Sequence, residues 1–106
     1  MNILLACNAG MSTSLLAEIM RQESTKQNKK NTIWCIDIEK VGKELNKCDI
    51  LLLGPQVKHT LKRLTNEFGG QIPIIMIPPS YYGRLDGKGV LSVVEYEFEN
   101  YYHKRK

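Results

Sequence analysis

Residues 2–16 read Asn-Ile-Leu-Leu-Ala-Cys-Asn-Ala-Gly-Met-Ser-Thr-Ser-Leu-Leu. The apolar run from Ile3 to Ala6 is long enough for a buried strand and too short for a helix. Cys7 ends that run, and turn-forming residues and hydroxyl side chains follow it. Apolar residues then recur at helical spacing, at Leu15, Leu16, Ile19 and Met20. The stretch therefore predicts a strand, a thiol, a tight loop and a helix N-terminus.

This order of elements aims backbone N–H groups and the positive end of a helix dipole at the sulfur of Cys7. Such a setting favours a thiolate and binds phosphate, so we interpret Cys7 as the carrier of a phosphoryl group. Gly10 lets the backbone turn toward a ligand without a Cβ clash, and the hydroxyls suit helix capping or phosphate binding. The expected phosphate-binding loop comprises Asn8, Ala9, Gly10, Met11, Ser12, Thr13 and Ser14. Taken alone, a cysteine at a strand end is more often a small buried hydrophobic residue, and it is the loop that favours chemistry.

Length and composition indicate one globular domain over residues 1–106, with 42% hydrophobic and 25% charged residues. No apolar run approaches the roughly 20 residues that span a bilayer. The N-terminus also lacks the basic segment and long apolar stretch of a signal peptide. We therefore expect a cytoplasmic protein without a transmembrane segment.

The three cysteines form an odd set without C-x-x-C spacing, which argues against a disulfide framework or a zinc site. We expect no metal and no cofactor. Cys35 alternates within an apolar strand and is interpreted as a core residue, whereas Cys48 suits either a strand-edge filler or an exposed thiol. A redox role would require one of these thiols to lie near Cys7.

The net charge of +4 is modest, and much of it lies in residues 26–30 and 103–106. These segments suit a solvated connection and a solvated terminus better than a nucleic-acid surface, so no nucleic-acid partner is expected. Attraction to an anionic membrane surface or to an acidic partner stays open. His59 falls on a lysine-flanked helical face, where we expect a solvated side chain.

Strand and helix patterns alternate along the whole chain. We expect strands at 3–6, 32–38, 50–53 and 72–77, helices after residue 12, over 39–46, over 57–68 and after Asp86, and a stiff loop at 78–83. The run 50–53 is apolar on both faces, as in a covered parallel strand, and Pro73 suits an edge strand.

This alternation predicts an α/β fold of three layers: a four-stranded parallel sheet with helices on both faces. If the chain doubles back after its second strand, the strand order is 2-1-3-4. Ligands of such sheets bind outside the carboxyl ends of the strands, at the reversal between strands 1 and 3. Cys7 lies at that point.

Residues 3–14 resemble the enzyme IIB component of the lactose/cellobiose/chitobiose branch of the bacterial phosphoenolpyruvate-dependent sugar phosphotransferase system. The resemblance covers essentially the whole chain. Further residues that carry it are Asp49 to Val57, Ile77-Pro78, Tyr82-Gly83 and Asp86-Gly87. The strand, cysteine and short loop also resemble the phosphate loop of low-molecular-weight tyrosine phosphatases, which share this type of fold.

The resemblance implies a relay. A phosphohistidine of a IIA protein would pass its phosphoryl group to Cys7, and a sugar delivered by the membrane component IIC would receive it. The family expectation for the sugar is a beta-linked disaccharide such as cellobiose, chitobiose or lactose. Tyr81, Tyr82 and Asp86 would lie near the same edge, where they suit a partner surface, core packing or helix capping.

A phosphatase is the alternative. Those enzymes use an arginine six positions after the cysteine and an aspartic acid beside a late proline, whereas this chain has Thr13 and Pro78-Pro79-Ser80. Without that clamp and acid, hydrolysis should be slow, which suits a carrier. A nucleotide- or effector-binding domain is a third possibility, but the glycine-rich nucleotide motifs are missing.

Overall fold

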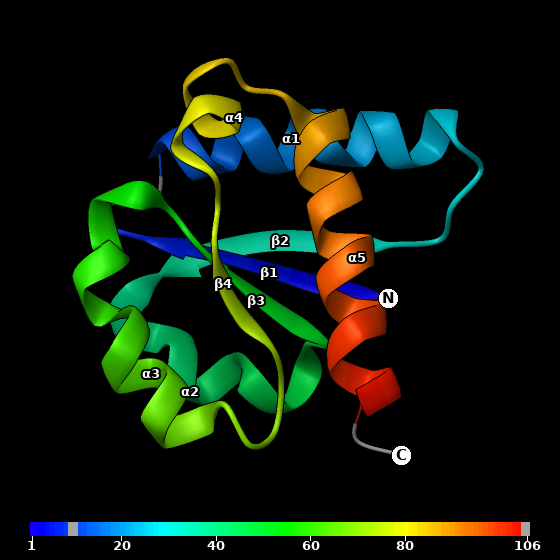
Figure 1. The fold of residues 1–106 in the computed structure, drawn as a ribbon. Coiled ribbons are helices and arrows are strands. Elements are labelled where there is room, and N and C mark those ends of the chain that lie inside the picture. The colour runs from blue at the N-terminus through cyan, green and yellow to red at the C-terminus, as the bar shows by residue number, and fades with distance from the viewer. Residues whose placement is uncertain (9–10, 105–106) are drawn as a thin grey trace.

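The four strands form one parallel sheet in the order β2-β1-β3-β4 in a computed structural model, which describes residues 1–8 and 11–104. The predicted order 2-1-3-4 is confirmed (Figure 1). The strands are β1 (Asn2–Cys7), β2 (Thr32–Asp37), β3 (Ile50–Leu53) and β4 (Ile74–Met76). The α-helices are α1 (Met11–Lys26), α2 (Val41–Glu44), α3 (Leu61–Phe68), α4 (Pro79–Gly83) and α5 (Gly87–Lys104). Short 3-10 helices are η1 (Ile38–Lys40), η2 (Leu45–Lys47) and η3 (Pro55–Thr60).

β1 is paired on both sides, with Leu5 opposite Cys35 of β2 and opposite Leu52 of β3. Every residue from Ile3 to Cys7 is buried, and so is all of β3. A strand that is covered on both faces needs an apolar run rather than alternation, which is the pattern that both segments have. β4 is an edge strand, as Pro73 indicated.

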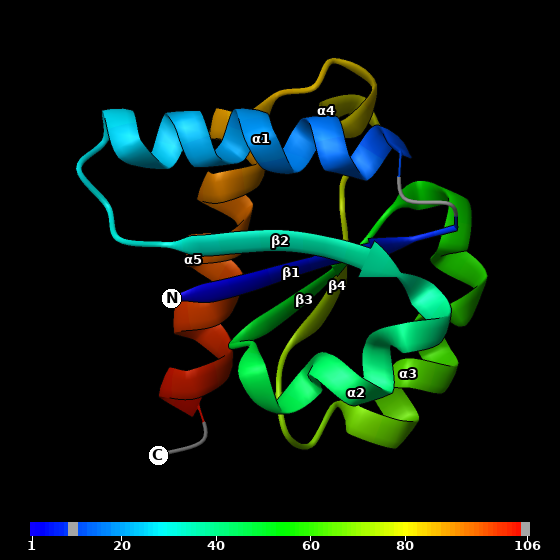
Figure 2. The same ribbon diagram turned by 180° about the vertical axis from the view of Figure 1, so that it is seen from behind.

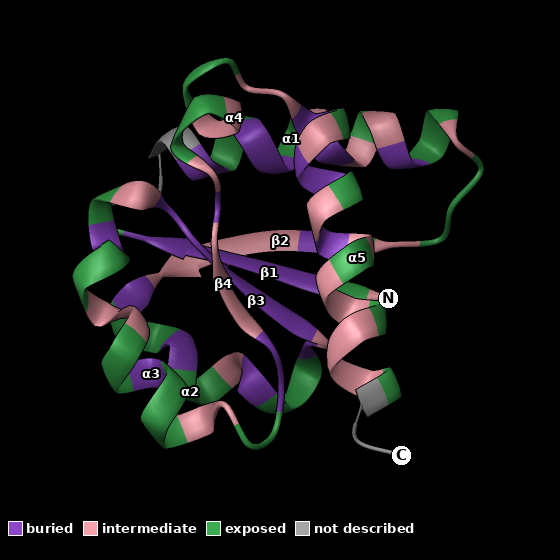
Figure 3. Ribbon diagram, in the orientation of Figure 1, coloured by how far each residue is buried: buried purple, intermediate pink, exposed green. Residues whose placement is uncertain are grey.

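Helices cover both faces of the sheet. α1 and α5 lie on one face, and η1, α2, η2, η3 and α3 lie on the other (Figures 1 and 2). Each face has its own apolar core, one around Leu5, Met20 and Leu91, the other around Leu4, Leu51 and Leu64. The buried residues accordingly gather along the central strands and the inward sides of the helices (Figure 3).

Three local predictions need correction. The stretch 78–83, expected as a loop, contains the short helix α4, because a proline in the first helical turn has a preset φ and needs no N–H partner. The helix expected over 39–46 is divided into η1, α2 and η2. The helix expected over 57–68 opens as η3, in which Val57 departs from helical geometry at φ −113° and ψ 22°. The expected start of the last helix after Asp86 is confirmed.

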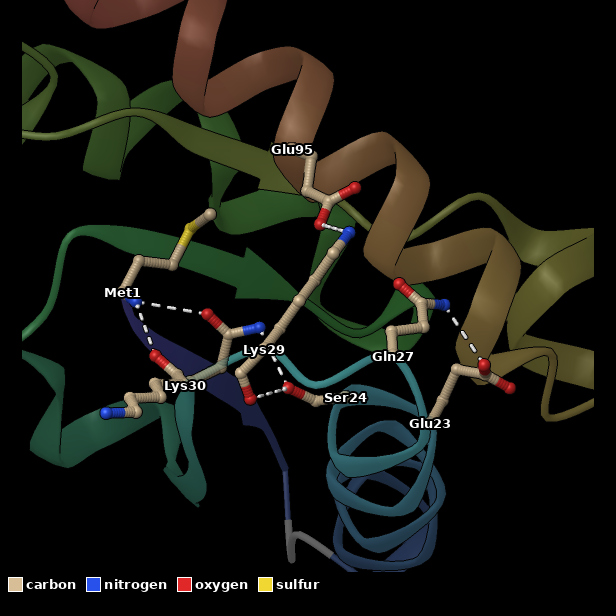
Figure 4. A network of polar contacts seen from close by, with 8 residues as sticks. Met1, Glu23, Ser24, Gln27, Lys29, Lys30 and Glu95 are labelled. Carbon is tan, nitrogen blue, oxygen red and sulfur yellow. Dashed lines mark hydrogen bonds and ion pairs between the residues drawn. The ribbon is translucent and has the colours of Figure 1, made fainter.

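The polar connection between α1 and β2 is held by its own hydrogen bonds (Figure 4). Ser24 Oγ, which is buried, donates to the carbonyl of Lys29 at 3.1 Å. The ammonium group of Met1 donates to the carbonyl of Lys30 at 3.1 Å. Lys29 also forms an ion pair with Glu95 of α5. The connection is therefore tied to the start of β1 and to the neighbouring helix.

Gly87, the first residue of α5, sets how closely that helix approaches α1. A Cβ at this position would lie 2.8 Å from Cγ2 of Ile19 and 3.1 Å from the backbone nitrogen of Met20. We expect Gly87→Ala to force the two helices apart and to lower the free energy of unfolding by about 1–3 kcal/mol in urea denaturation. Gly83→Ala is the matched control, because a Cβ there would meet nothing within 4 Å. Equal stability of the two variants would contradict this account of the helix contact.

Candidate functional site

Cys7 is the last residue of β1 and lies at the carboxyl edge of the sheet, between β2 and β3. It is opposite Asp37 in the β1–β2 register. Only 3% of Cys7 is exposed, and it packs in the apolar core that also contains Val57 of η3. The topological reversal between β1 and β3 thus brings the cysteine to the place that the strand order predicts for a ligand.

Within residues 1–8 and 11–104, two oxygen atoms contact the sulfur. Sγ of Cys7 donates to the carbonyl of Asn8 at 3.3 Å, and Oγ1 of Thr13 lies 3.2 Å from the same sulfur. A thiol has one proton, so when the thiol donates its hydrogen bond to the Asn8 carbonyl, the Thr13 hydroxyl is the donor to the sulfur. The Thr13 side chain is fully buried, in the first turn of α1. In the thiolate form, the Thr13 hydroxyl still donates a hydrogen bond to the sulfur, whereas the Asn8 carbonyl no longer receives one.

Gly54 adjoins the cysteine, a position that the sequence pattern did not predict. A Cβ at this position would lie 3.0 Å from Cβ of Cys7 and 3.0 Å from Oε1 of Gln56. The backbone N–H of Gly54 donates to the carbonyl of Ala6 at 2.9 Å, which brings the chain after β3 against the end of β1. A glycine directly after a buried strand was the available signal, because such a residue allows close backbone approach.

The predicted loop also contains Asn8, Ala9, Gly10, Met11, Ser12 and Ser14. Ala9 and Gly10 lie outside the described residues, and Met11 and Ser12 are the first two residues of α1. Asn8 is exposed. Ser14 is exposed too, and its Oγ lies 3.2 Å from Sγ of Cys35 on β2. The role of this loop in binding phosphate stays a prediction.

The segment after β4 supplies Tyr81, Tyr82 and Asp86. Asp86 caps α5, because its Oδ1 accepts a hydrogen bond from the backbone nitrogen of Gly89 at 2.8 Å. Tyr81 and Tyr82 are half-buried against the core between α1 and α5. The guanidinium of Arg84 lies 5.7 Å from the centre of the Tyr81 ring. Packing and capping are thus observed for these residues, and contact with a partner stays a prediction.

The remaining two thiols are free. Cys48 is buried and its Sγ donates to the carbonyl of Leu45 at 3.6 Å, so it fills the core rather than facing solvent. Burial and, secondarily, the neighbouring carboxylate of Asp49 raise the pKa of the Cys48 thiol to about 11. Cys35, expected in the core, is half-buried at the face that α1 covers. Over residues 1–8 and 11–104, no three His, Cys, Asp or Glu side chains are placed to hold a metal ion.

This chain is similar in sequence to known proteins. The family described as "PTS system, Lactose/Cellobiose specific IIB subunit" matches residues 2–93. An oligo-beta-mannoside-specific EIIB component from Bacillus subtilis (strain 168) is 35% identical over 89 residues, which cover 81% of this chain and 84% of the relative. A cellobiose-specific EIIB component from Lactococcus lactis subsp. lactis (strain IL1403) is 37% identical over 100 residues, which cover 88% of this chain and 92% of the relative.

This chain is also similar in fold to solved structures. The solution structure of a cellobiose-specific phosphotransferase IIB component from Borrelia burgdorferi has a TM-score of 0.79 and 36% sequence identity, covering 94% of this chain and 93% of that one. The lactose-specific IIB domain from Streptococcus pneumoniae has a TM-score of 0.83 at 15% identity, covering 92% and 96% of the two chains. At that identity the second likeness is one of fold alone.

The raised pKa of Cys48 leads to a testable pH dependence of stability. The folded chain holds this thiol protonated up to about pH 11, whereas in the unfolded chain it ionises near its ordinary value of 9.0. Its contribution to stability is therefore complete below pH 9 and is lost as the pH rises toward 11. We expect the free energy of unfolding to fall more steeply over this interval in the unchanged chain than in Cys48→Ala. Urea denaturation at a series of pH values measures both curves, and parallel curves would disprove the assignment.

Proposed function

This chain belongs to the lactose/cellobiose-specific IIB subunit family of the sugar phosphotransferase system, and we propose that Cys7 is the residue on which it carries the phosphoryl group. The chain is accordingly a phosphotransferase component rather than a phosphatase. The observation that carries the assignment to Cys7 is its position, at the carboxyl end of the central strand and in hydrogen-bond contact with the first turn of α1.

The first chemical step is attack by the thiolate of Cys7 on the phosphorus of a phosphohistidine in the IIA protein. A P–S bond forms, the P–N bond breaks, and its electron pair returns to the imidazole nitrogen of the donor. In the second step a sugar hydroxyl oxygen attacks the same phosphorus. The P–S bond breaks, its electron pair stays on sulfur as the thiolate, and the hydroxyl proton passes to the surrounding base or water.

Thr13 supports both steps through its hydroxyl. The group is buried and 3.2 Å from the sulfur, so its orientation needs no rearrangement when negative charge develops there. We propose that it donates to the thiolate before the first transfer and again as the leaving sulfur of the second transfer acquires charge. The N-terminus of α1 adds the positive end of its dipole on the same side.

Thr13 also explains why water should be a poor acceptor of the phosphoryl group. A phosphatase of similar fold would have an arginine where this chain has Thr13, and it would have an acid beside the prolines that precede and begin α4. Here that stretch reads Pro78-Pro79-Ser80. A hydroxyl cannot replace a bidentate guanidinium, and without an acid the leaving group departs unprotonated. The site thus suits transfer to a positioned acceptor more than hydrolysis.

The partners that we propose are a IIA protein as donor and a IIC permease as the source of the sugar. In the part of the chain that the structure describes, no helix has the length and apolar character needed to cross a bilayer. We propose a cytoplasmic location with transient docking at the permease. For the sugar we propose a beta-linked disaccharide, in line with the cellobiose specificity named for one of the relatives.

We expect Cys7→Ala and Cys7→Ser to abolish formation of phosphocysteine when the chain is incubated with its donor system and labelled phosphoenolpyruvate. Cys7 lies at the carboxyl end of the central strand, whereas Cys35 lies within β2 and Cys48 is buried in the core, so Cys35→Ser and Cys48→Ser should still take up label. Lability of the label to iodine identifies phosphocysteine. Label that persists on this chain in Cys7→Ala, or label recovered on a histidine of this chain, would overturn the proposal.

A second prediction concerns the Thr13 hydroxyl. Thr13→Val keeps the shape of the side chain but removes the donor to sulfur, and we expect phosphoryl transfer to slow at least about tenfold. Thr13→Ser restores the hydroxyl and should restore most of the rate. Single-turnover labelling gives both rates, and thermal unfolding checks that the variants are folded. Equal rates in the two variants would contradict this role of the hydroxyl, and a slow Thr13→Ser beside an unchanged Thr13→Val would assign the effect to the methyl group.

A further inference from the structure

A row of basic side chains begins in η3, close to the carboxyl end of β1, and continues into the start of α3. It comprises Lys58, His59, Lys62 and Arg63, which we call the basic row. All four residues are exposed. Lys58 and His59 lie in η3, and Lys62 and Arg63 follow in the first turn of α3. The last three of them line a shallow open hollow together with Asn66 and Glu67.

The row faces outward because the other side of the same segment is committed to the core. Val57 and Leu64 are buried, and Leu61 and Phe68 pack against the same apolar cluster. No acidic residue occurs between positions 50 and 66. The ion pairs formed among residues 1–8 and 11–104 leave out all four side chains of the row. Glu67, which lines the same hollow, offsets part of this charge, and the row keeps a net positive charge.

The basic row begins beside Cys7. Gly54, which adjoins Cys7, immediately precedes η3, and Val57 of η3 shares a buried cluster with Cys7. In both ribbon views η3 lies at the end of β1, near the start of α1 (Figures 1 and 2). We therefore expect a protein that brings a phosphoryl group to Cys7 to cover surface near Lys58, the residue after Val57.

We propose that the basic row is a docking surface for an acidic patch on the protein that donates the phosphoryl group. This inference rests on the proposed function of Cys7. The lysines and the arginine of the row add three positive charges to one side of the site, in a chain whose net charge is +4. Such a concentration of charge attracts an acidic partner before contact and favours the orientation that presents its phosphoryl group to Cys7.

A protein partner fits the row better than a membrane or a nucleic acid. Sequence clusters that bind anionic lipid contain about four to eight Lys or Arg residues, more than the three here. The apolar side of α3 is buried in the core, so it cannot insert into a bilayer as an amphipathic helix does. Phe, Tyr and Trp side chains, which provide most base-stacking platforms, are also missing between positions 55 and 67.

The test reverses charge in the basic row with Lys58→Glu/Lys62→Glu and compares it with Lys26→Glu/Lys30→Glu. Both double variants change the net charge equally, and the control residues are exposed at the far end of α1 and in the connection after it. The probe is a IIA protein charged with labelled phosphoenolpyruvate by the donor system. At limiting donor and about 0.05 M salt, we expect the row variant to label Cys7 about tenfold more slowly than the unchanged chain.

Further expected results separate docking from chemistry. The rate of the control variant should stay within about twofold of the unchanged chain. The deficit of the row variant should shrink at about 0.5 M salt and disappear at saturating donor, because only encounter is affected. Circular dichroism checks that both variants are folded.

Some outcomes would overturn the inference. Equal slowing of the two double variants would mean that net charge alone matters, and unchanged labelling of the row variant would remove the docking surface. Loss of binding to phosphatidylglycerol vesicles with unchanged labelling would assign the row to a membrane. Failure of the unchanged chain itself to become labelled on Cys7 would instead overturn the proposed function.

Discussion

The structure depends on one constraint, which is that β1 must be paired on both sides and covered on both faces at once. Its neighbours β2 and β3 satisfy the backbone hydrogen bonds, and helices from both layers bury residues 3–7 completely or nearly so. A strand so enclosed can reach the surface only at its ends. The side chain at its carboxyl end is therefore held by rigid elements on several sides, and in this chain that side chain is a thiol.

The contacts of Cys7 follow from this enclosure. Gly54 lacks a side chain, so the end of β3 closes against the cysteine. Thr13 enters from α1 with its methyl group and hydroxyl both buried, and its hydroxyl contacts the sulfur. Preorganisation of this kind is what phosphoryl transfer needs from a protein, because the reaction itself requires little covalent help.

Much of the architecture was predictable from local pattern. The apolar runs at 3–6 and 50–53 predicted central parallel strands, and alternation of strands with helices predicted the sheet order once the chain doubled back. Helix α4 was missed because a proline-rich stretch was interpreted as a loop, although prolines are well suited to a first helical turn. The helix types within segments 39–46 and 55–68 were harder to predict, because competition between 3-10 and α-helical turns depends on how each turn packs on the sheet.

For the site, the sequence by itself determined the residue types on which the proposed chemistry rests: a cysteine at a strand end, hydroxyls where a helix begins, and Thr13 where a phosphatase would have arginine. Those are properties of residue type and spacing, which need no contact to be recognised. Only the tertiary structure decided which hydroxyl faces the sulfur, that Gly54 adjoins Cys7, that Asp86 is a cap, and that Cys48 is buried with a raised pKa. Each of these depends on the packing of residues from separate elements or on the local backbone course, and spacing along the chain does not encode either.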